Sequence, residues 1–137
     1  ATDTYVSDTA GNFILTAALR LTIVCAKQIA QEGGFDDVLV FMRDALGKAV
    51  PDANVYIFAL RALAAVLPAG RARIMNNSFR LDVVASVVRN LAIAREGFMS
   101  LKPTEADEQE WERLSNELLT FARSVRAFWR AFSQGGN

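Results

Sequence analysis

The last third of the sequence carries an apolar seam that commits this part of the chain to one long helix. Large apolar residues recur there at alternating spacings of three and four, as in packed helices, and they are Trp111, Leu114, Leu118, Phe121, Val125, Phe128 and Phe132. Pro103 stands just before the segment, and Thr104 with Asp107 resembles a capping box. Acidic residues occupy the first turns and arginines the last turns, which complements the helix dipole at both ends. We therefore expect a helix that starts near Thr104 and continues along the seam.

Three more helical segments precede the seam, over about 6–32, 35–67 and from Asn77 or Ser78 onward. Turn-forming residues separate the segments at Gly33-Gly34, at Pro68-Ala69-Gly70 and at Lys102-Pro103. The first segment has an apolar face that is expected to pack on the rest of the chain. This face consists of Ile14, Ala18, Leu21 and Cys25, widened by Leu15, Leu19 and Val24.

The predicted fold is all-α. Pro51 interrupts the second segment, and Asp52 is a suitable N-cap for a new helix. Because the loops between segments are short, neighbouring helices should run antiparallel. The expected architecture is an up-down-up-down four-helix bundle with a kinked or split second helix near Pro51. Residues 1–137 form a single helical domain, with 133–137 as a frayed tail.

The composition removes most routes to catalysis. The chain has no histidine and one cysteine, so no imidazole can act as a general base or bind a metal. Cys25 lies in an apolar stretch, which favours a buried structural thiol over a nucleophile. The acidic run 105–112 is interpreted as a solvated helix start, since a bundle metal site needs carboxylates from several helices. We predict no catalytic residue, cofactor or metal, and we expect that the chain is not an enzyme. An enzyme that uses only carboxylates and arginine stays open as an alternative, although no cluster of such residues in the sequence indicates one.

Charge is segregated along the chain, although the formal net charge is zero. Residues 61–102 hold seven basic residues against two acidic ones, whereas residues 105–117 hold six acidic residues against one basic. One interpretation is that the third and fourth helices pair through these charges or that both faces are solvated. The other is a basic surface, centred on Arg71, Arg73 and Arg80, that docks on an acidic protein partner. Lys102 and Trp129, one step off the apolar seam, are further docking candidates.

Other partner classes are not indicated. A balanced charge gives no global attraction to nucleic acid, and no arginine or lysine stripe alternates with exposed aromatics, so we predict no nucleic-acid partner. No uncharged apolar run reaches about 18 residues, the length needed to span a bilayer. We expect a chain that is peripheral to a membrane rather than spanning it, and monomeric when free. Ala1 is compatible with removal of a targeting peptide.

The order of these features resembles a family, the small lumenal extrinsic proteins of photosystem II, which are four-helix bundles of this size. The assembly and repair type of this family begins with Tyr-x-x-Asp-Thr, and Tyr5, Asp8 and Thr9 match. Further along, this sequence matches with Ala59-Leu60-Arg61-Ala62-Leu63, Arg71 and Arg73, Ser78-Phe79, Leu91, Pro103 and Glu105. The stretch from Ile23 to Pro51 is longer than in that type, and a lipid-bearing N-terminal cysteine is missing. In these two respects the chain is more similar to a Q-type or diatom-type algal subunit.

The resemblance implies a thylakoid-lumen location in a plastid and docking on the photosystem II core and other extrinsic subunits. It implies support of the oxygen-evolving complex without ligation of its metal cluster. A self-assembling structural helical bundle, like a helical viral coat subunit, is the alternative, and a generic helical protein-interaction module is another. Arg71, Arg73 and Arg80 are docking candidates from charge alone.

Overall fold

The structure is a computed structural model that describes the backbone of residues 2–32, 34–47 and 52–135 and the side chains from residue 13 onward within these ranges. The described residues are helical with no β-strand, which confirms the all-α prediction. The helices are α1 (Thr2–Val24), α2 (Ala26–Gln31), α3 (Phe35–Gly47), α4 (Ala53–Ala69), α5 (Arg71–Met75), α6 (Ser78–Ser100) and α7 (Glu105–Gly135).

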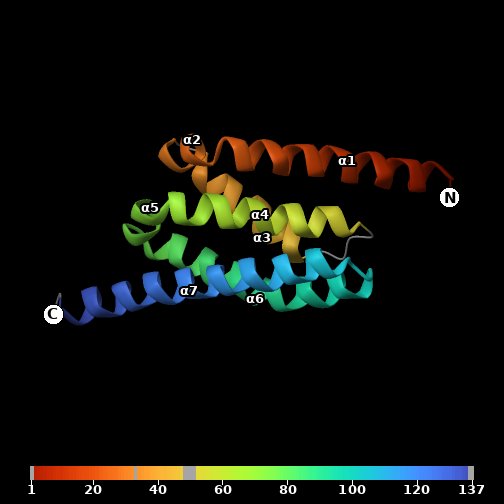
Figure 1. Ribbon diagram of the computed structural model, residues 1–137. Helices are drawn as coiled ribbons and strands as arrows, with labels where there is room; N and C mark the ends of the chain where they lie inside the picture. The colour runs from red at the N-terminus through yellow and green to blue at the C-terminus, as the bar shows by residue number, and fades with distance from the viewer. Residues whose placement is uncertain (1, 33, 48–51, 136–137) are drawn as a thin grey trace.

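The helix α4 lies at the centre of the arrangement. The helix α1 packs along one side of α4, and α6 and α7 form an antiparallel pair on the opposite side (Figure 1). The helix α3 packs mainly against α6 and also touches α4, while the short helices α2 and α5 lie together at one end of the molecule. The connection between α6 and α7 lies at the other end.

Capping groups set several of the helix boundaries as predicted. The Asp52 carboxylate accepts a hydrogen bond from the backbone N–H of Asn54 at 2.9 Å, so α4 begins as a separate helix. The Asn77 side chain accepts from the N–H of Phe79 at 2.8 Å at the start of α6. Pro51 itself lies outside the described residues, but α3 and α4 are two helices, so the second segment is split.

Two boundaries differ from the sequence expectation. The first segment is broken at Cys25, which lies between α1 and α2 and is half-buried rather than fully buried. The helix α7 continues through Gly135, so residues 133–135 are helical where a frayed tail was predicted; residues 136–137 lie outside the described part. The break at Cys25 has no proline or glycine signal in the sequence, and Ser133 and Gln134 permit the helix to continue up to the glycines that follow them.

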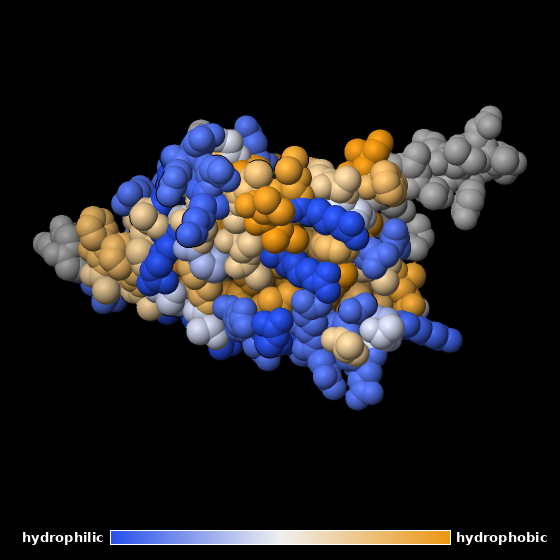
Figure 2. Space-filling view, turned by 45° about the horizontal axis from the view of Figure 1, so that its top comes forward, coloured by the Kyte–Doolittle hydropathy of each residue, from blue (hydrophilic) through white to orange (hydrophobic). Residues whose placement is uncertain are grey.

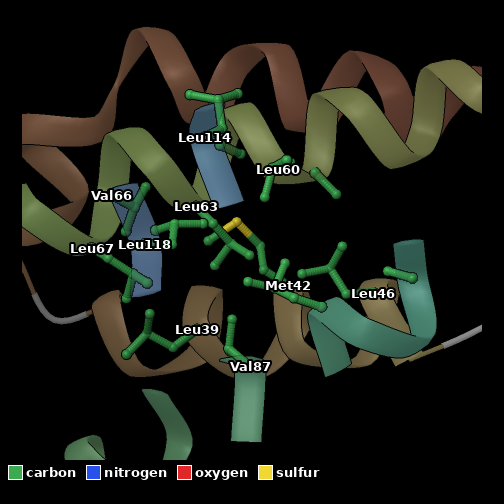
Figure 3. Packing of buried hydrophobic residues seen from close by; sticks show 14 of the residues in the cluster. Leu39, Met42, Leu46, Leu60, Leu63, Val66, Leu67, Val87, Leu114 and Leu118 are labelled. Carbon is green, nitrogen blue, oxygen red and sulfur yellow. The ribbon is translucent and has the colours of Figure 1, made fainter. Parts of the chain in front are cut away.

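The core is aliphatic and is built around α4 and α3. Figure 3 shows Met42 of α3 among leucine side chains from α4 and α7, with Val87 of α6 closing the cluster from below. All of these side chains are buried. The residues labelled there are Leu39, Met42, Leu46, Leu60, Leu63, Val66, Leu67, Val87, Leu114 and Leu118. Because α4 contributes nine buried residues, its position fixes where the other helices can pack.

The predicted packing face of α1 is wrong at its centre and right only at Leu15 and Leu19, which widen it. Ile14, Ala18 and Leu21 are exposed, and the buried positions are Leu19 of α1 with Ala26 and Ala30 of α2. The cause is that α1 packs chiefly on one neighbour, α4, which covers only a narrow stripe of a helix that is apolar on several sides. Periodicity cannot select the buried side of such a helix.

A group of three aromatic rings lies at the end of the core that is nearest to the connection between α6 and α7. The Phe98 and Trp111 rings stack with centroids 4.7 Å apart, and the Tyr56 ring meets both edge-on at 6.3 and 6.5 Å. Gly97 of α6 lies directly under this group, since a Cβ atom at Gly97 would overlap the phenol of Tyr56. A glycine is therefore required here by space, although it weakens the helix.

We predict that Gly97→Ala destabilises the protein by about 1–3 kcal/mol, because the added methyl group must displace the Tyr56 ring from its aromatic neighbours. Helix propensity alone would favour alanine by about 1 kcal/mol, so the sign of the change in the free energy of unfolding separates the two effects. Urea unfolding of both proteins measures this free energy. Gly34→Ala is the matched control, since a Cβ atom there meets nothing within 4 Å, and it should be neutral or slightly stabilising. A more stable Gly97→Ala variant would contradict this packing.

Candidate docking surfaces

Of the five residues predicted to dock a partner, four lie near the α5 end of the molecule. The helix α5 carries Arg71 and Arg73, and Trp129 of α7 reaches it through a hydrogen bond from Nε1 to the carbonyl of Ile74 at 3.4 Å. The tight turn before α5 is possible because Gly70 is buried against the Phe35 ring, where a side chain would overlap. Trp129 thus lies at the same end as the predicted basic residues, although it follows Arg71 by 58 positions in the sequence.

Arg73 and Arg80 are engaged within the chain. Arg80 donates from Nε and Nη2 to the two carboxylate oxygens of Asp36 at 2.5 and 3.2 Å, and its Nη1 donates to the carbonyl of Arg73 at 3.1 Å. The hydrogen bonds to Asp36 raise the pKa of Arg80, against a smaller effect of burial. Arg73 donates to the carbonyl of Gln31, which ties α5 to α2. Both arginines thus hold helices together at this end, and all three guanidinium nitrogens of Arg80 already donate within the chain.

Arg71 is exposed and better placed for a partner. Its Nη1 donates to Ser124 Oγ at 2.9 Å, and its guanidinium lies 5.9 Å from the centre of the Phe121 ring. No carboxylate pairs with Arg71 among the described residues. A charge that is positioned but unpaired can still attract an acidic surface.

The aromatic end of α7 lies beside Arg71 and was only partly expected. The seam aromatics were expected to be mainly core, with one of Phe128 and Trp129 partly exposed. In the structure Phe128 and Phe132 are 43% and 63% exposed, because α7 extends past the helices that cover its earlier turns (Figure 1). Their rings stack at 6.4 Å, and Trp129 meets Phe132 edge-on at 5.9 Å. Arg71, Phe128, Trp129 and Phe132 together are called the end patch below.

Lys102 lies apart from the end patch. It belongs to the connection between α6 and α7, at the opposite end of the molecule (Figure 1). Its backbone has a positive φ of 53°, the left-handed conformation that often follows a helix. Pro103 comes next, and the Thr104 hydroxyl accepts from the N–H of Asp107 at 3.2 Å, as the capping prediction requires. Lys102 therefore cannot share a small binding surface with Arg71.

A second apolar surface lies on α1, and sequence reasoning missed it. Phe13, Ile14, Leu21 and Val24 are 64–81% exposed. Figure 2 shows hydrophobic side chains over the α1 face of the molecule, with hydrophilic side chains around them. Large exposed side chains of this kind on one helix are typical of a surface that another molecule covers. The apolar character of α1 was visible in the sequence, but not which side would remain uncovered.

The segregated charges do pair helices, as the first interpretation of the sequence holds. Arg95 of α6 donates to Glu112 of α7 at 2.8 Å, on the surface. Arg61 of α4 donates twice to Glu110 of α7, at 2.5 and 3.0 Å, and its guanidinium lies 4.8 Å from the centre of the Phe58 ring. Hydrogen bonds from Arg61 lower the pKa of Glu110, against the opposing effect of burial. This half-buried pair fixes α7 against α4.

The described residues contain no group of three or more histidine, cysteine or carboxylate side chains that could hold a metal ion. Among the helices of the described part, none combines the length and the apolar character that a membrane crossing requires. Comparison of the chain with protein-family models, with curated proteins and with solved structures gave no match. Inference about function therefore depends on the surfaces of the chain itself.

We predict that Glu110→Gln lowers the free energy of unfolding by about 1 kcal/mol at neutral pH, through loss of the charged partner of Arg61. The folded-state pKa of Glu110 is depressed, so its contribution is present above the ordinary carboxyl pKa of about 4.5 and disappears as the pH falls through the lower, folded value. Denaturant unfolding of both proteins across this pH range measures the difference.

Glu117→Gln is the matched control for this prediction. Glu117 also pairs with an arginine, Arg113 at 3.2 Å, but both side chains are more than half exposed. Its loss should change the stability by less than about 0.5 kcal/mol at any pH. If the Glu110→Gln penalty were independent of pH, the Arg61 pair would not be its cause.

Proposed function

We propose that the chain is a non-catalytic accessory subunit that docks on the lumenal side of photosystem II and supports or stabilises the oxygen-evolving complex. The proposal places the protein in the thylakoid lumen of a plastid, peripheral to the membrane, in contact with the photosystem core and other extrinsic subunits. It is supported by the order of features that resembles the assembly and repair type, which covers most of the chain.

The proposal also includes the four-helix bundle of that family. The four longest helices, α1, α4, α6 and α7, would correspond to its four helices, and α3 would be the detached first half of the second one. The packing of α3 against both α4 and α6 is consistent with this assignment, because a split helix must still cover the core that its continuous form would cover.

The observation that carries the docking proposal is the end patch. It combines an unpaired guanidinium, Arg71, with the exposed rings of Phe128 and Phe132 and the partly exposed ring of Trp129. Aromatic and arginine side chains supply most of the binding energy in protein interfaces, because they bury large areas and also make directed polar contacts. An acidic surface with an apolar centre would complement this patch.

Reconstitution tests the proposal. Photosystem II particles washed free of their extrinsic proteins should bind the chain at low ionic strength and recover oxygen evolution. We predict that Arg71→Glu raises the Kd of this binding about tenfold or more by placing a carboxylate against the acidic partner. Lys102→Glu changes the charge equally at the opposite end of the molecule and should raise the Kd less than about threefold. Failure of the unmodified chain to bind would refute the proposed function, and equal effects of the two variants would refute the end patch as the docking site.

A self-assembling structural bundle is the second candidate, and the exposed side of α1 favours it. Phe13, Ile14 and Leu21 could be covered by further copies of the chain. In that case sedimentation should reveal large ordered assemblies that grow with protein concentration, and Leu21→Gln should dissolve them with little loss of stability, because Leu21 is 64% exposed. Leu19→Gln, at a fully buried position, is the contrasting variant that should unfold the protein instead. Assemblies that persist in Leu21→Gln would exclude α1 as their contact surface.

A further inference from the structure

The helix α7 carries two triplets of opposite charge with identical spacing. The first triplet is Glu105, Glu108 and Glu112, and the second is Arg123, Arg126 and Arg130. Equivalent members are 18 residues apart, which is five whole turns of an α-helix, so both triplets lie on the same side of α7. Their centres are about 27 Å apart along the axis. These six residues are called the charge stripe.

The charge stripe is complementary to the charge stripe of a second copy whose α7 runs in the opposite direction. If a second α7 runs antiparallel about a midpoint between Glu117 and Leu118, Glu105 of one copy faces Arg130 of the other, and Glu112 faces Arg123. Glu108 and Arg126 then meet within one residue. The same contacts occur twice, related by a two-fold axis, which is the geometry of an isologous dimer.

The members of the charge stripe are available for such contacts. All three arginines are exposed, and within the described residues none of them takes part in an ion pair. Glu105 accepts only a long hydrogen bond from Gln109, at 3.4 Å. Glu112 accepts from Arg95 at 2.8 Å, but this pair is about half exposed, so Glu112 can be shared with a second cation. Among the described residues, the arginine half of the stripe therefore forms no ion pair of its own.

The surface between the triplets can be covered by a second helix. A groove of about 420 Å³ runs between α6 and α7 beside the second triplet. Its floor is apolar, with Val84 and Val88 from α6 and Leu119 and Ala122 from α7. Arg89 and Asp82 of α6 also line this groove, so the net positive charge that would face the partner's glutamates comes from Arg123 and Arg126. Burial of this floor would add a hydrophobic contribution beside the second triplet of each copy.

We propose that two copies of the chain form an antiparallel dimer through the charge stripe of α7. A second copy fits better than a merely acidic partner, because an acidic surface would satisfy the arginines and repel the glutamates on the same face. The sequence led us to expect a monomer when free, and the proposed dimer departs from that expectation. The dimer does not depend on the proposed function, and it leaves the end patch free, because Phe128 and Phe132 lie on a different side of α7.

Charge reversal tests the dimer. One variant carries Arg123→Glu, Arg126→Glu and Arg130→Glu, and the other carries Glu105→Arg, Glu108→Arg and Glu112→Arg. Each variant alone should be monomeric, because its two stripes have the same sign. An equimolar mixture should form a heterodimer, since one stripe is then wholly acidic and the other wholly basic. Sedimentation equilibrium and native mass spectrometry measure the masses, and the mixture also shows that both variants retain a folded surface.

Two controls complete the experiment. Exchange of Arg113 and Glu117, as Arg113→Glu with Glu117→Arg, alters charges on another side of α7 and should leave the dimer unchanged. The dimer of the unmodified chain should weaken about tenfold or more when the salt concentration rises from about 50 to about 500 mM. The proposal is overturned if the unmodified chain is monomeric up to about millimolar concentration, a regime in which weak dimers form. It is also overturned if the reversed variants stay dimeric alone or fail to associate when mixed while circular dichroism shows native helicity.

Discussion

The burial of α4 is the constraint on which the rest of the structure depends. Every other long helix takes its place by covering part of α4 or of the core that α4 creates, and Leu60, Leu63 and Val66 are fully buried at its centre. Hydrophobic burial gives no direction to a contact, so polar groups decide how the outer helices are placed. Arg61 with Glu110 positions α7 against α4, and Arg80 with Asp36 positions α6 against α3. An apolar centre therefore determines stability, and a few ion pairs determine the arrangement.

The features that distinguish this molecule lie on its exterior. The buried residues of the described part are apolar apart from groups such as the Tyr56 phenol, which is 2% exposed. An interior of this kind holds the helices in place. The surfaces differ from one another, by contrast: aromatic rings and an arginine form the end patch, apolar side chains lie along α1, and opposite charges share one side of α7. These are the properties of a protein that works by contact, which is the basis of the proposed role as an accessory subunit.

Sequence reasoning predicted the parts of the fold that depend on local signals. The all-helical class, the Asp52 and Asn77 caps and the turn at Lys102 follow from capping and turn chemistry, and the structure has each of them. The sequence could not show which side of α1 is covered, because that depends on how few neighbours α1 has. It also could not show that Arg80 is taken by Asp36, 44 residues away, or that Phe128 extends past the bundle, since both depend on where other helices end.

Hydrogen–deuterium exchange of the chain, free and bound to salt-washed photosystem II particles, tests the central claim most directly. If the protein acts through its exterior, binding should slow exchange at α5 and the last turns of α7 and leave the already protected amides of α4 unchanged. The contrary result is a change in exchange centred on α4 with none at the α5 end. That outcome would show that the interior rearranges on binding and that the surfaces described above are not where the protein acts.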